Sequence, residues 1–377
     1  MYLERILLNN FKNISEADLS FSPKLNCISG NNGEGKTNLL DAVHYLCMTR
    51  SYQLFPDNFS IHHGFDMASV NGTFRMDDGT SNKISVALYG KNVKESKIVK
   101  KNDKVYKKLS EHIGLFPIVM VSPTDGALIY MGGGERRAFV NKLLSQIDRE
   151  YLQMLQNYNR LLLQRNRILK DEFLQNDLLE TIDLQMQPCA EYIYGMRKKI
   201  CDMLSESITY YHSKFCDRGE KVKMVYDTQL GKESFPELMS DSRERDRFLK
   251  YTSAGVHRDD FIFEISESEG DTGYYPIKRC ASQGQQKSFL IALKLAQFSI
   301  MKELNGGVAP ILLLDDIFDK LDMNRVEYLL SMVSGNSFGQ IFITDSNKVR
   351  MNSLVEKIGG ECKNFEVSAG VISEVAQ

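Results

Sequence analysis

The sequence lacks any apolar run long enough to cross a membrane. Its longest runs, Leu115–Val121 and Val308–Leu314, fall far short of the roughly 20 residues that a spanning helix requires. The N-terminus also lacks a basic stretch followed by a long apolar segment, which is the pattern of a secretory signal. These absences predict a cytoplasmic protein that makes no membrane contact.

Cysteine is scarce and follows no pattern. There are seven cysteines, an odd number, and no two of them are separated by two residues. Neither a disulfide framework nor a zinc site is therefore indicated. We expect buried, reduced thiols, as is usual in the cytosol.

The chain has almost no excess charge of either sign. Its 47 basic and 49 acidic residues leave a formal net charge of −2. No field of the whole molecule attracts nucleic acid, so binding to DNA would require a local cluster of positive charge. Hydrophobic residues at 42% and charged residues at 25% exclude a disordered or low-complexity chain.

The length of 377 residues suggests about two domains, or one domain with a large insert. Hydrophobic patterning favours the second arrangement. It predicts strands over 3–8, 17–21 and 25–29, a helix over 38–47, an antiparallel sheet over 67–109 and a buried strand over 113–121. Residues 135–217 show helical spacing, and strands return at 261–265, 311–314 and 341–344. We therefore predict an α/β head formed by residues 1–125 and 250–377, split by a helical insert at 126–249. The insert is either a short antiparallel helical hairpin or an ordinary helical subdomain.

A glycine-rich segment joins the third strand to the first helix. Gly30 to Thr37 reads Gly-Asn-Asn-Gly-Glu-Gly-Lys-Thr, which fits the phosphate-loop pattern G-x-x-x-x-G-K-[ST]. Glycines let backbone amides approach phosphate oxygens, and the loop ends at a helix N-terminus that favours anions. We predict an ATP or GTP site in which the lysine reaches the β- and γ-phosphates and the threonine ligates Mg²⁺. The predicted nucleotide-binding residues are Gly30, Asn31, Asn32, Gly33, Glu34, Gly35, Lys36, Thr37 and Asn38.

Two carboxylates follow the apolar strand Ile311 to Leu314. Asp315 would lie at the carboxyl edge of a parallel sheet, where nucleotides bind, and is predicted to hold Mg²⁺ together with Thr37. Asp316 is predicted to orient or deprotonate the attacking water. The alternative is a pair of aspartates that only caps a loop.

A second candidate anion site opens the helix that begins near residue 283. Ser282 can cap this helix, and the backbone amides around Gly284 and Gln285 can meet an anion. Such a site is useful if it contacts the γ-phosphate held by another subunit.

These three motifs together resemble the ABC-type ATPase head that the SMC and RecF families carry. The resemblance rests on Gly30 to Asn38, on Ser282-x-Gly-Gln-x-Lys287, and on Asp315-Asp316 followed by Leu321-Asp322. Further stretches are similar to the RecF family in particular, and the similarity spans residues 3 to about 346. These stretches are Ser122 to Asp125, Gly133 to Arg137, Tyr158 to Arg160, Gln164 to Asn166 and Gly255 to Asp260.

The resemblance implies an α/β, SMC-like P-loop ATPase head with an inserted helical subdomain, using ATP and Mg²⁺. It also implies a head-to-tail homodimer, with Asp322 in the D-loop at the seam, and action in recombinational repair of gaps, DNA replication and the SOS response. Single-stranded or gapped DNA and mediators of the RecR and RecO type are the implied partners. Val256 replaces the usual proline, Asp316 stands where most ABC ATPases have Glu, and neither a Q-loop glutamine nor a switch histidine is evident. The last two absences favour slow hydrolysis, as in a weak, DNA-stimulated ATPase used as a switch.

Two other functional classes stay open from the sequence. One is an ATP-binding interaction protein that does not hydrolyse ATP. The other is a nuclease subunit of another family built on an ABC head, which would need an added acidic metal-binding domain.

The residues from 91 to 108 concentrate positive charge. Eight lysines against Glu95 and Asp103 give this predicted hairpin a local net charge of +6, which suits phosphate contacts. A solvated sheet edge protected by lysines explains the same pattern equally well. The candidate DNA-contacting residues are Lys97, Lys100, Lys101 and Lys104. A second candidate is the helix face with Arg160, Arg165, Arg167 and Lys170.

The segment His257-Arg258-Asp259-Asp260 combines groups that could form a catalytic or metal site. It contains a single histidine, and its two aspartates precede an apolar strand. A turn held by ion pairs near the ATPase head is the favoured interpretation.

Overall fold

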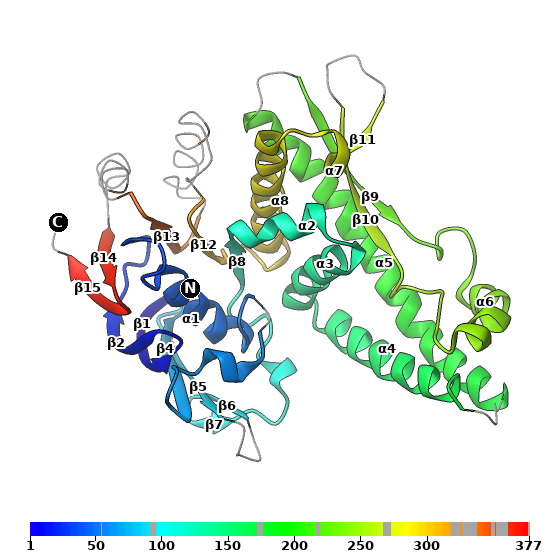
Figure 1. The fold of residues 1–377 in the computed structure, drawn as a ribbon, viewed down its shortest axis with the longest axis horizontal. Helices are drawn as coiled ribbons and strands as arrows, with labels where there is room; N and C mark the ends of the chain where they lie inside the picture. The colour runs from blue at the N-terminus through cyan, green and yellow to red at the C-terminus, as the bar shows by residue number, and fades with distance from the viewer. Residues whose placement is uncertain are drawn as a thin grey trace. The chain divides into compact units, whose positions relative to one another are not determined.

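The computed structural model describes residues 1–53, 55–90, 96–171, 176–215, 219–266, 273–317, 325, 338–347, 351 and 361–375 (Figure 1). Asp322, the expected D-loop residue, lies outside these residues. The chain forms two compact units: residues 1–125 with 297–377, and residues 126–296.

The first unit contains an antiparallel sheet in the order β2-β1-β4-β5-β6-β7. Side chains alternate between a buried and an outward face along β4 and β5, as expected for a sheet with one covered side. This arrangement confirms the sheet predicted over 67–109. The strand bounds are β1 Tyr2–Phe11, β2 Ile14–Ser20, β4 Met67–Arg75, β5 Ser81–Tyr89, β6 Lys97–Lys101 and β7 Lys104–Val105.

A second sheet in this unit has the order β15-β14-β3-β13-β12-β8. Its strands run parallel except for β15, which pairs antiparallel with β14. The four strands β3, β13, β12 and β8 are almost wholly buried, which explains the continuous apolar runs of β8 and β12. The strand bounds are β3 Leu25–Ser29, β8 Ile118–Val121, β12 Ile311–Leu314, β13 Ile341–Asp345, β14 Cys362–Ser368 and β15 Val371–Val375.

Helix α1, Lys36–Met48, contacts strands of both sheets. Almost every residue along it is buried, because apolar side chains leave it on opposite sides: Leu40 and Ala42, two residues apart, are both fully covered. The helix and the two sheets share one hydrophobic core. The described residues also include short 3₁₀ turns at Asp57–Ser60, Leu109–Glu111 and Pro123–Gly126.

The second unit is mainly helical, as predicted, and the long helices α4 and α5 pack against each other. Helix α4 begins at an Asp148 cap, whose side chain accepts a hydrogen bond from the Tyr151 amide. Helix α8 begins in this unit and ends in the first one. The helix bounds are α2 Ala127–Tyr130, α3 Gly133–Ile147, α4 Arg149–Ile168, α5 Asn176–Phe215, α6 Phe235–Leu249, α7 Ile277–Cys280 and α8 Gln283–Leu304.

The second unit differs from the expected insert in two ways. It contains a small antiparallel sheet of β9 (Lys221–Asp227), β10 (Asp260–Ser266) and β11 (Tyr275–Pro276), and it extends to residue 296. The reason is that β10, which reads in the sequence as the return of the head, pairs along its whole length with β9. The segment from 250 to 296 therefore packs with the insert's own strand.

Six of the seven cysteines lie within the described residues, and all six are free thiols. Four of them are buried, namely Cys27, Cys47, Cys189 and Cys201, whereas Cys280 is exposed. Within the described part of the chain, no helix is long and apolar enough to span a membrane.

Candidate nucleotide-binding site

The phosphate loop connects β3 to α1 through three glycines with positive φ. Gly30 has a φ of 155°, and a Cβ there would lie 2.4 Å from the backbone oxygen of Val367 on β14. Gly35 has a φ of 118° directly before the first helical residue. Only glycine fits at both positions, because one is crowded by backbone and the other takes a left-handed conformation. The sequence pattern therefore corresponds to a real geometric requirement.

Lys36 is buried at the start of α1. Its side chain is only 3% exposed, and its Nζ donates to the carbonyl oxygens of Gly30 at 2.9 Å and of Asn31 at 3.1 Å. Asp316 Oδ1 lies 3.9 Å from the same nitrogen. The ammonium group is thus held at the centre of the loop, where phosphate oxygens of a nucleotide would meet it.

Thr37 and Asp315 meet although 278 residues separate them in the sequence. Thr37 Oγ1 lies 2.9 Å from Oδ1 and 3.0 Å from Oδ2 of the carboxylate. Burial raises the pKa of Asp315, while hydrogen bonds from Thr37 and Thr344 oppose that shift. A buried carboxylate beside a hydroxyl is the oxygen donor set that Mg²⁺ prefers, so the two residues predicted to hold the metal fit it.

Asp316, the predicted catalytic residue, adopts a left-handed conformation with a φ of 44°. Its side chain is 28% exposed, in contrast to the buried Asp315. Its backbone nitrogen donates to Thr344 Oγ1 at 2.9 Å. The two aspartates therefore point into different environments, and only the second has access to water.

The structure adds an asparagine that the sequence analysis missed. Asn13, in the turn between β1 and β2, donates through Nδ2 to the backbone oxygen of Glu34 at 2.9 Å and accepts from Asn38 Nδ2 at 2.7 Å. The Gly370 amide donates to the same Glu34 oxygen at 3.0 Å. The side chain of Asn38 thus supports the loop through Asn13, which in turn bonds to the Glu34 backbone. No sequence signal identifies Asn13, because it lies 21 residues before the residue it contacts.

A second group of missed residues surrounds the segment after α1. Asp41 accepts from Lys12 Nζ at 2.7 Å, from Ser51 Oγ at 2.8 Å and from the Tyr52 amide at 2.7 Å. The Tyr52 hydroxyl donates to Asp125, the residue that ends the Ser-Pro-Thr-Asp stretch after β8. Burial, followed by the charge of Asp125, raises the pKa of Tyr52. These contacts tie the segment that follows α1 to the carboxyl end of β8.

The predicted signature residues lie at the start of α8, in the second unit. The Gln285 amide donates to Ser282 Oγ at 3.3 Å, and the Ser282 amide donates to Gln285 Oε1 at 2.6 Å. This reciprocal cap agrees with the predicted capping role of Ser282. Gln285 Nε2 also donates to Glu220 at 2.8 Å. Gly284 follows within the first turn of the helix.

The four candidate DNA lysines do not share one face. Lys97 points inward: its Nζ donates to the Thr49 oxygen at 2.8 Å, pairs with Asp57 at 2.9 Å and lies over the ring of Tyr45. Lys101 lies on the same side of β6 as Lys97, because side chains alternate along a strand, and it is half-buried. Lys100 and Lys104 are exposed.

The second candidate DNA surface, the α4 face predicted to carry Arg160, Arg165, Arg167 and Lys170, lacks one of these cations. Arg165 is fully buried and pairs with Asp183 at 2.7 Å and with Asp246 at 2.6 Å. The prediction that Arg165 lies on a basic helix face is therefore wrong, because its side chain supports the packing of α4 against α5 and α6.

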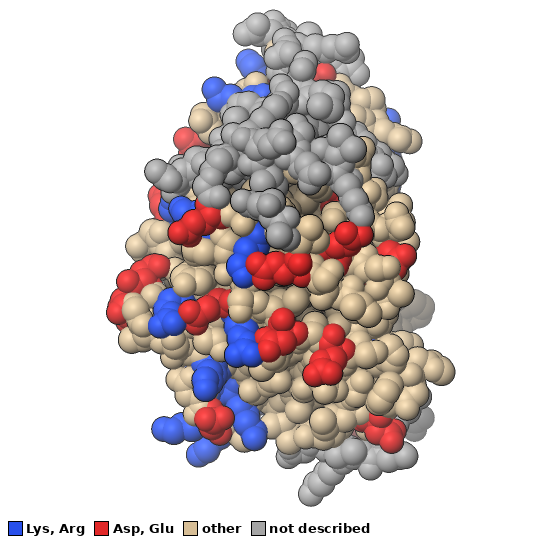
Figure 2. Space-filling model, turned by 90° about the vertical axis from the view of Figure 1, so that its left-hand side faces the viewer, with Lys and Arg blue, Asp and Glu red and all other residues tan. Residues whose placement is uncertain are grey.

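On the face shown in Figure 2, the coloured residues mix Lys and Arg with Asp and Glu rather than presenting one sign of charge.

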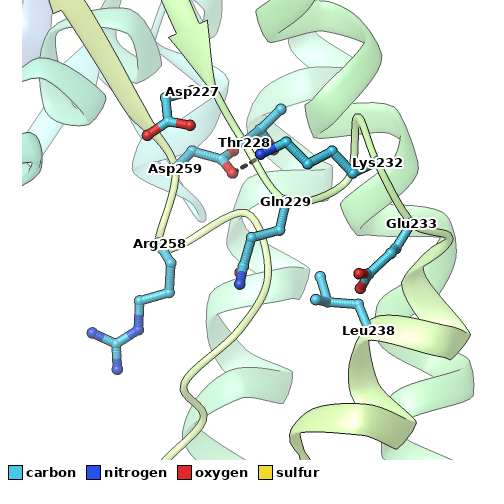
Figure 3. A pocket seen from close by; sticks show the side chains of 8 residues that line it. All are labelled: Asp227, Thr228, Gln229, Lys232, Glu233, Leu238, Arg258 and Asp259. Atoms are coloured by element: carbon cyan, nitrogen blue, oxygen red, sulfur yellow. Dashed lines mark hydrogen bonds between the residues drawn. The ribbon is translucent and has the colours of Figure 1, made fainter.

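The segment 257–260 is engaged in ion pairs, as the favoured interpretation expects. Asp259 accepts from Arg197 at 2.7 Å and from Thr228 at 2.7 Å, and Asp260 pairs with Arg136 at 2.7 Å. A hollow of about 280 Å³ lies beside Asp259 (Figure 3). Its lining residues are Asp227, Thr228, Gln229, Lys232, Glu233, Leu238, Arg258 and Asp259.

Comparison with known proteins agrees with this geometry. Residues 2–366 match the family described as the RecF/RecN/SMC N terminal domain. The DNA replication and repair protein RecF of Parabacteroides distasonis is 42% identical over 377 residues, covering all of both chains. That of Porphyromonas gingivalis is 42% identical over 375 residues, covering 99% of this chain and 100% of the relative.

Solved structures agree as well. One described as the recombination mediator protein RecF-ATP in the RecFOR pathway superposes with a TM-score of 0.88 at 29% identity, covering 100% of this chain and 98% of that one. The Smc head domain of Pyrococcus furiosus shares the fold, with a TM-score of 0.58 at 17% identity over 99% of this chain and 96% of that one. The expected SMC-like ATPase fold is thus confirmed, and the chain belongs to the RecF family of DNA replication and repair proteins.

Proposed function

We propose that this protein is an ATP-dependent DNA-binding switch whose first unit binds MgATP. The observation that carries the proposal is the meeting of Lys36, Thr37 and Asp315 at one edge of the parallel sheet, with Thr37 Oγ1 2.9 Å from the carboxylate. The solved relative described as RecF-ATP supports ATP as the nucleotide.

The phosphate loop would bind the nucleotide through its backbone amides and through Lys36. The Nζ of this lysine would exchange its bonds to the neutral Gly30 and Asn31 carbonyl oxygens for bonds to phosphate oxygens, in which both partners are charged. Thr37 and Asp315 would hold Mg²⁺, and the metal would neutralise phosphate charge. Asp316, the more exposed carboxylate, would accept a hydrogen bond from the attacking water. Turnover would be weak because the sequence has neither an evident Q-loop glutamine nor a switch histidine.

The start of α8 would act on the nucleotide of a second copy. Ser282, Gly284 and Gln285 lie at a helix N-terminus, which favours an anion. The Ser282 and Gln285 amides would exchange their bonds within the cap for bonds to that anion. The resemblance to ABC heads supports a two-fold pair in which this signature would lie against the partner's ATP, so that each subunit would complete the other's site. ATP binding would then assemble the homodimer, and hydrolysis would release it.

DNA and other repair proteins are the proposed partners. Lys100 and Lys104 are exposed and would contact phosphates, and gapped duplex or single-stranded DNA is the proposed substrate. The relative's place in the RecFOR pathway supports cooperation with mediators of the RecO and RecR type. We propose action in the cytoplasm, in gap repair, replication and the SOS response.

The test compares Lys36→Ala with wild type by sedimentation with ATP, with ADP and without nucleotide, each with and without a gapped duplex. Losing the lysine should lower ATP affinity at least about tenfold, because a charge-assisted bond contributes about 1.5–3 kcal/mol. Wild type should form an ATP-dependent dimer, whereas Lys36→Ala should not. Lys24→Ala, an exposed lysine just before β3, is the matched control. Unchanged ATP affinity in folded Lys36→Ala would refute the assignment of the nucleotide site.

A further inference from the structure

Strand β13 lies between the two strands that carry the nucleotide motifs. It pairs with β3, which leads into the phosphate loop, and with β12, which leads into Asp315. In register, Ile343 faces Leu314 and Thr344 faces Ile28. Thr344 therefore lies at the edge of the sheet where β3 leads into the phosphate loop and β12 leads into Asp315.

The Thr344 hydroxyl contacts both aspartates at once. It donates to Asp315 Oδ1 at 2.9 Å and accepts from the Asp316 amide at 2.9 Å. The threonine is fully buried, so water does not compete for these bonds. One hydroxyl thus fixes the carboxylate of one aspartate and the backbone of the next.

The backbone of Asp316 depends on this contact because its φ is 44°, a conformation that non-glycine residues seldom adopt. Asp315 is also held by Thr37 Oγ1, which lies within hydrogen-bond distance of both carboxylate oxygens. A carboxylate held between two hydroxyls keeps one orientation, and groups that orient a metal ligand in this way tune metal binding.

We propose that Thr344 is a positioning residue for ATP hydrolysis: it orients Asp315 toward Mg²⁺ and sets the backbone from which Asp316 reaches the attacking water. The inference rests on the proposed function and supplies a residue at the end of β13, where the sequence has no switch histidine. Thr344 itself touches neither nucleotide nor water in this proposal.

The test uses Thr344→Val, which keeps the β-branched shape and removes the hydroxyl, and Thr344→Ser, which keeps the hydroxyl. Single-turnover hydrolysis with excess protein gives the rate, and a fluorescent ATP analogue titrated with and without Mg²⁺ gives affinity. Thr344→Val should lower the rate at least about tenfold, should change metal-free nucleotide affinity less than about threefold, and should weaken the gain in affinity from Mg²⁺. Thr344→Ser should restore most of both losses.

Thr73→Val, on β4 and remote in sequence from every nucleotide motif, is the control for replacing a strand threonine. A wild-type rate and Mg²⁺ response in Thr344→Val would overturn the inference. Equal loss in Thr344→Ser and Thr344→Val would also overturn it, because shape rather than the hydroxyl would then matter. Failure of wild type and Thr73→Val to bind ATP would instead refute the proposed function, and the inference with it.

Discussion

The buried ion pair between Arg197 and Asp259 offers a quantitative test of what holds the second unit together. The guanidinium and the carboxylate are 2.7 Å apart, and their side chains are 2% and 1% exposed. The carboxylate also accepts bonds from the Tyr226 and Thr228 hydroxyls. Asp259→Asn would keep the shape of the side chain and leave the arginine charge buried without its counterion.

The expected cost follows from that burial. Removing one partner of a buried pair typically costs about 3–5 kcal/mol. In a unit of 171 residues, from 126 to 296, each kcal/mol moves the unfolding midpoint by about 2–4 °C. The transition of the second unit should therefore fall by roughly 6–20 °C in calorimetry. A double-mutant cycle with Arg197→Met should show a coupling energy of about 0.5–3 kcal/mol.

Glu180→Gln is the matched control in the same unit. Glu180 pairs with Arg243 at 2.7 Å, but its side chain is 56% exposed, so the loss should stay within about 1 kcal/mol. If Asp259→Asn lowers the midpoint no more than Glu180→Gln does, the pair does not stabilise the unit. Additive effects of Asp259→Asn and Arg197→Met on the free energy of unfolding would also contradict the reasoning.

Three further outcomes are expected. Ser282→Arg should leave ATP binding by the single subunit nearly intact and abolish ATP-induced dimerisation in sedimentation; wild-type hydrolysis by a monomeric variant would contradict the shared site. Replacing Lys100 and Lys104 by alanine should lower the slope of log K against log salt by roughly 0.9 per lost contact on duplex DNA, and an unaltered slope would favour a solvated sheet edge. Burial lowers the pKa of His112 from 6.5 to about 4, so the unfolded chain binds the extra proton between these values. Stability should therefore fall by up to about 3 kcal/mol as the pH drops from 6.5 to 4, and His112→Gln should remove that part of the loss in chemical denaturation.

The head could be predicted from sequence because its signals are local. The phosphate loop is one uninterrupted segment whose glycines have required conformations, and buried strands such as Ile311–Leu314 are apolar throughout. Ser282 and Gln285 form their cap within three residues of each other. Patterns of this kind are visible without knowing which distant segments pack together.

Other features depend on contacts between distant segments. Arg165 is predicted from the sequence to lie on a basic helix face, yet it is buried against carboxylates from other elements, and Arg197 is buried in the same way. Lys97 belongs to a run of lysines, but the alternation of β6 points it inward. Asn13 and Thr344 carry no motif at all. Each of these positions depends on tertiary packing, which outweighs local charge and propensity.

The contacts between the phosphate loop and the C-terminal strands have a consequence for the synthesis of the chain. The backbone of Val367 lies against Gly30, and the amides of Ala369 and Gly370 bind Glu34, which precedes them by 335 residues or more. The loop emerges from the ribosome early, whereas the segment that fixes its shape emerges only after the whole second unit. A nascent chain that ends before residue 362 therefore lacks β14, and its phosphate loop lacks the contacts with Val367, Ala369 and Gly370. Competence to bind nucleotide should thus arise late in synthesis, since contacts this distant in sequence form slowly.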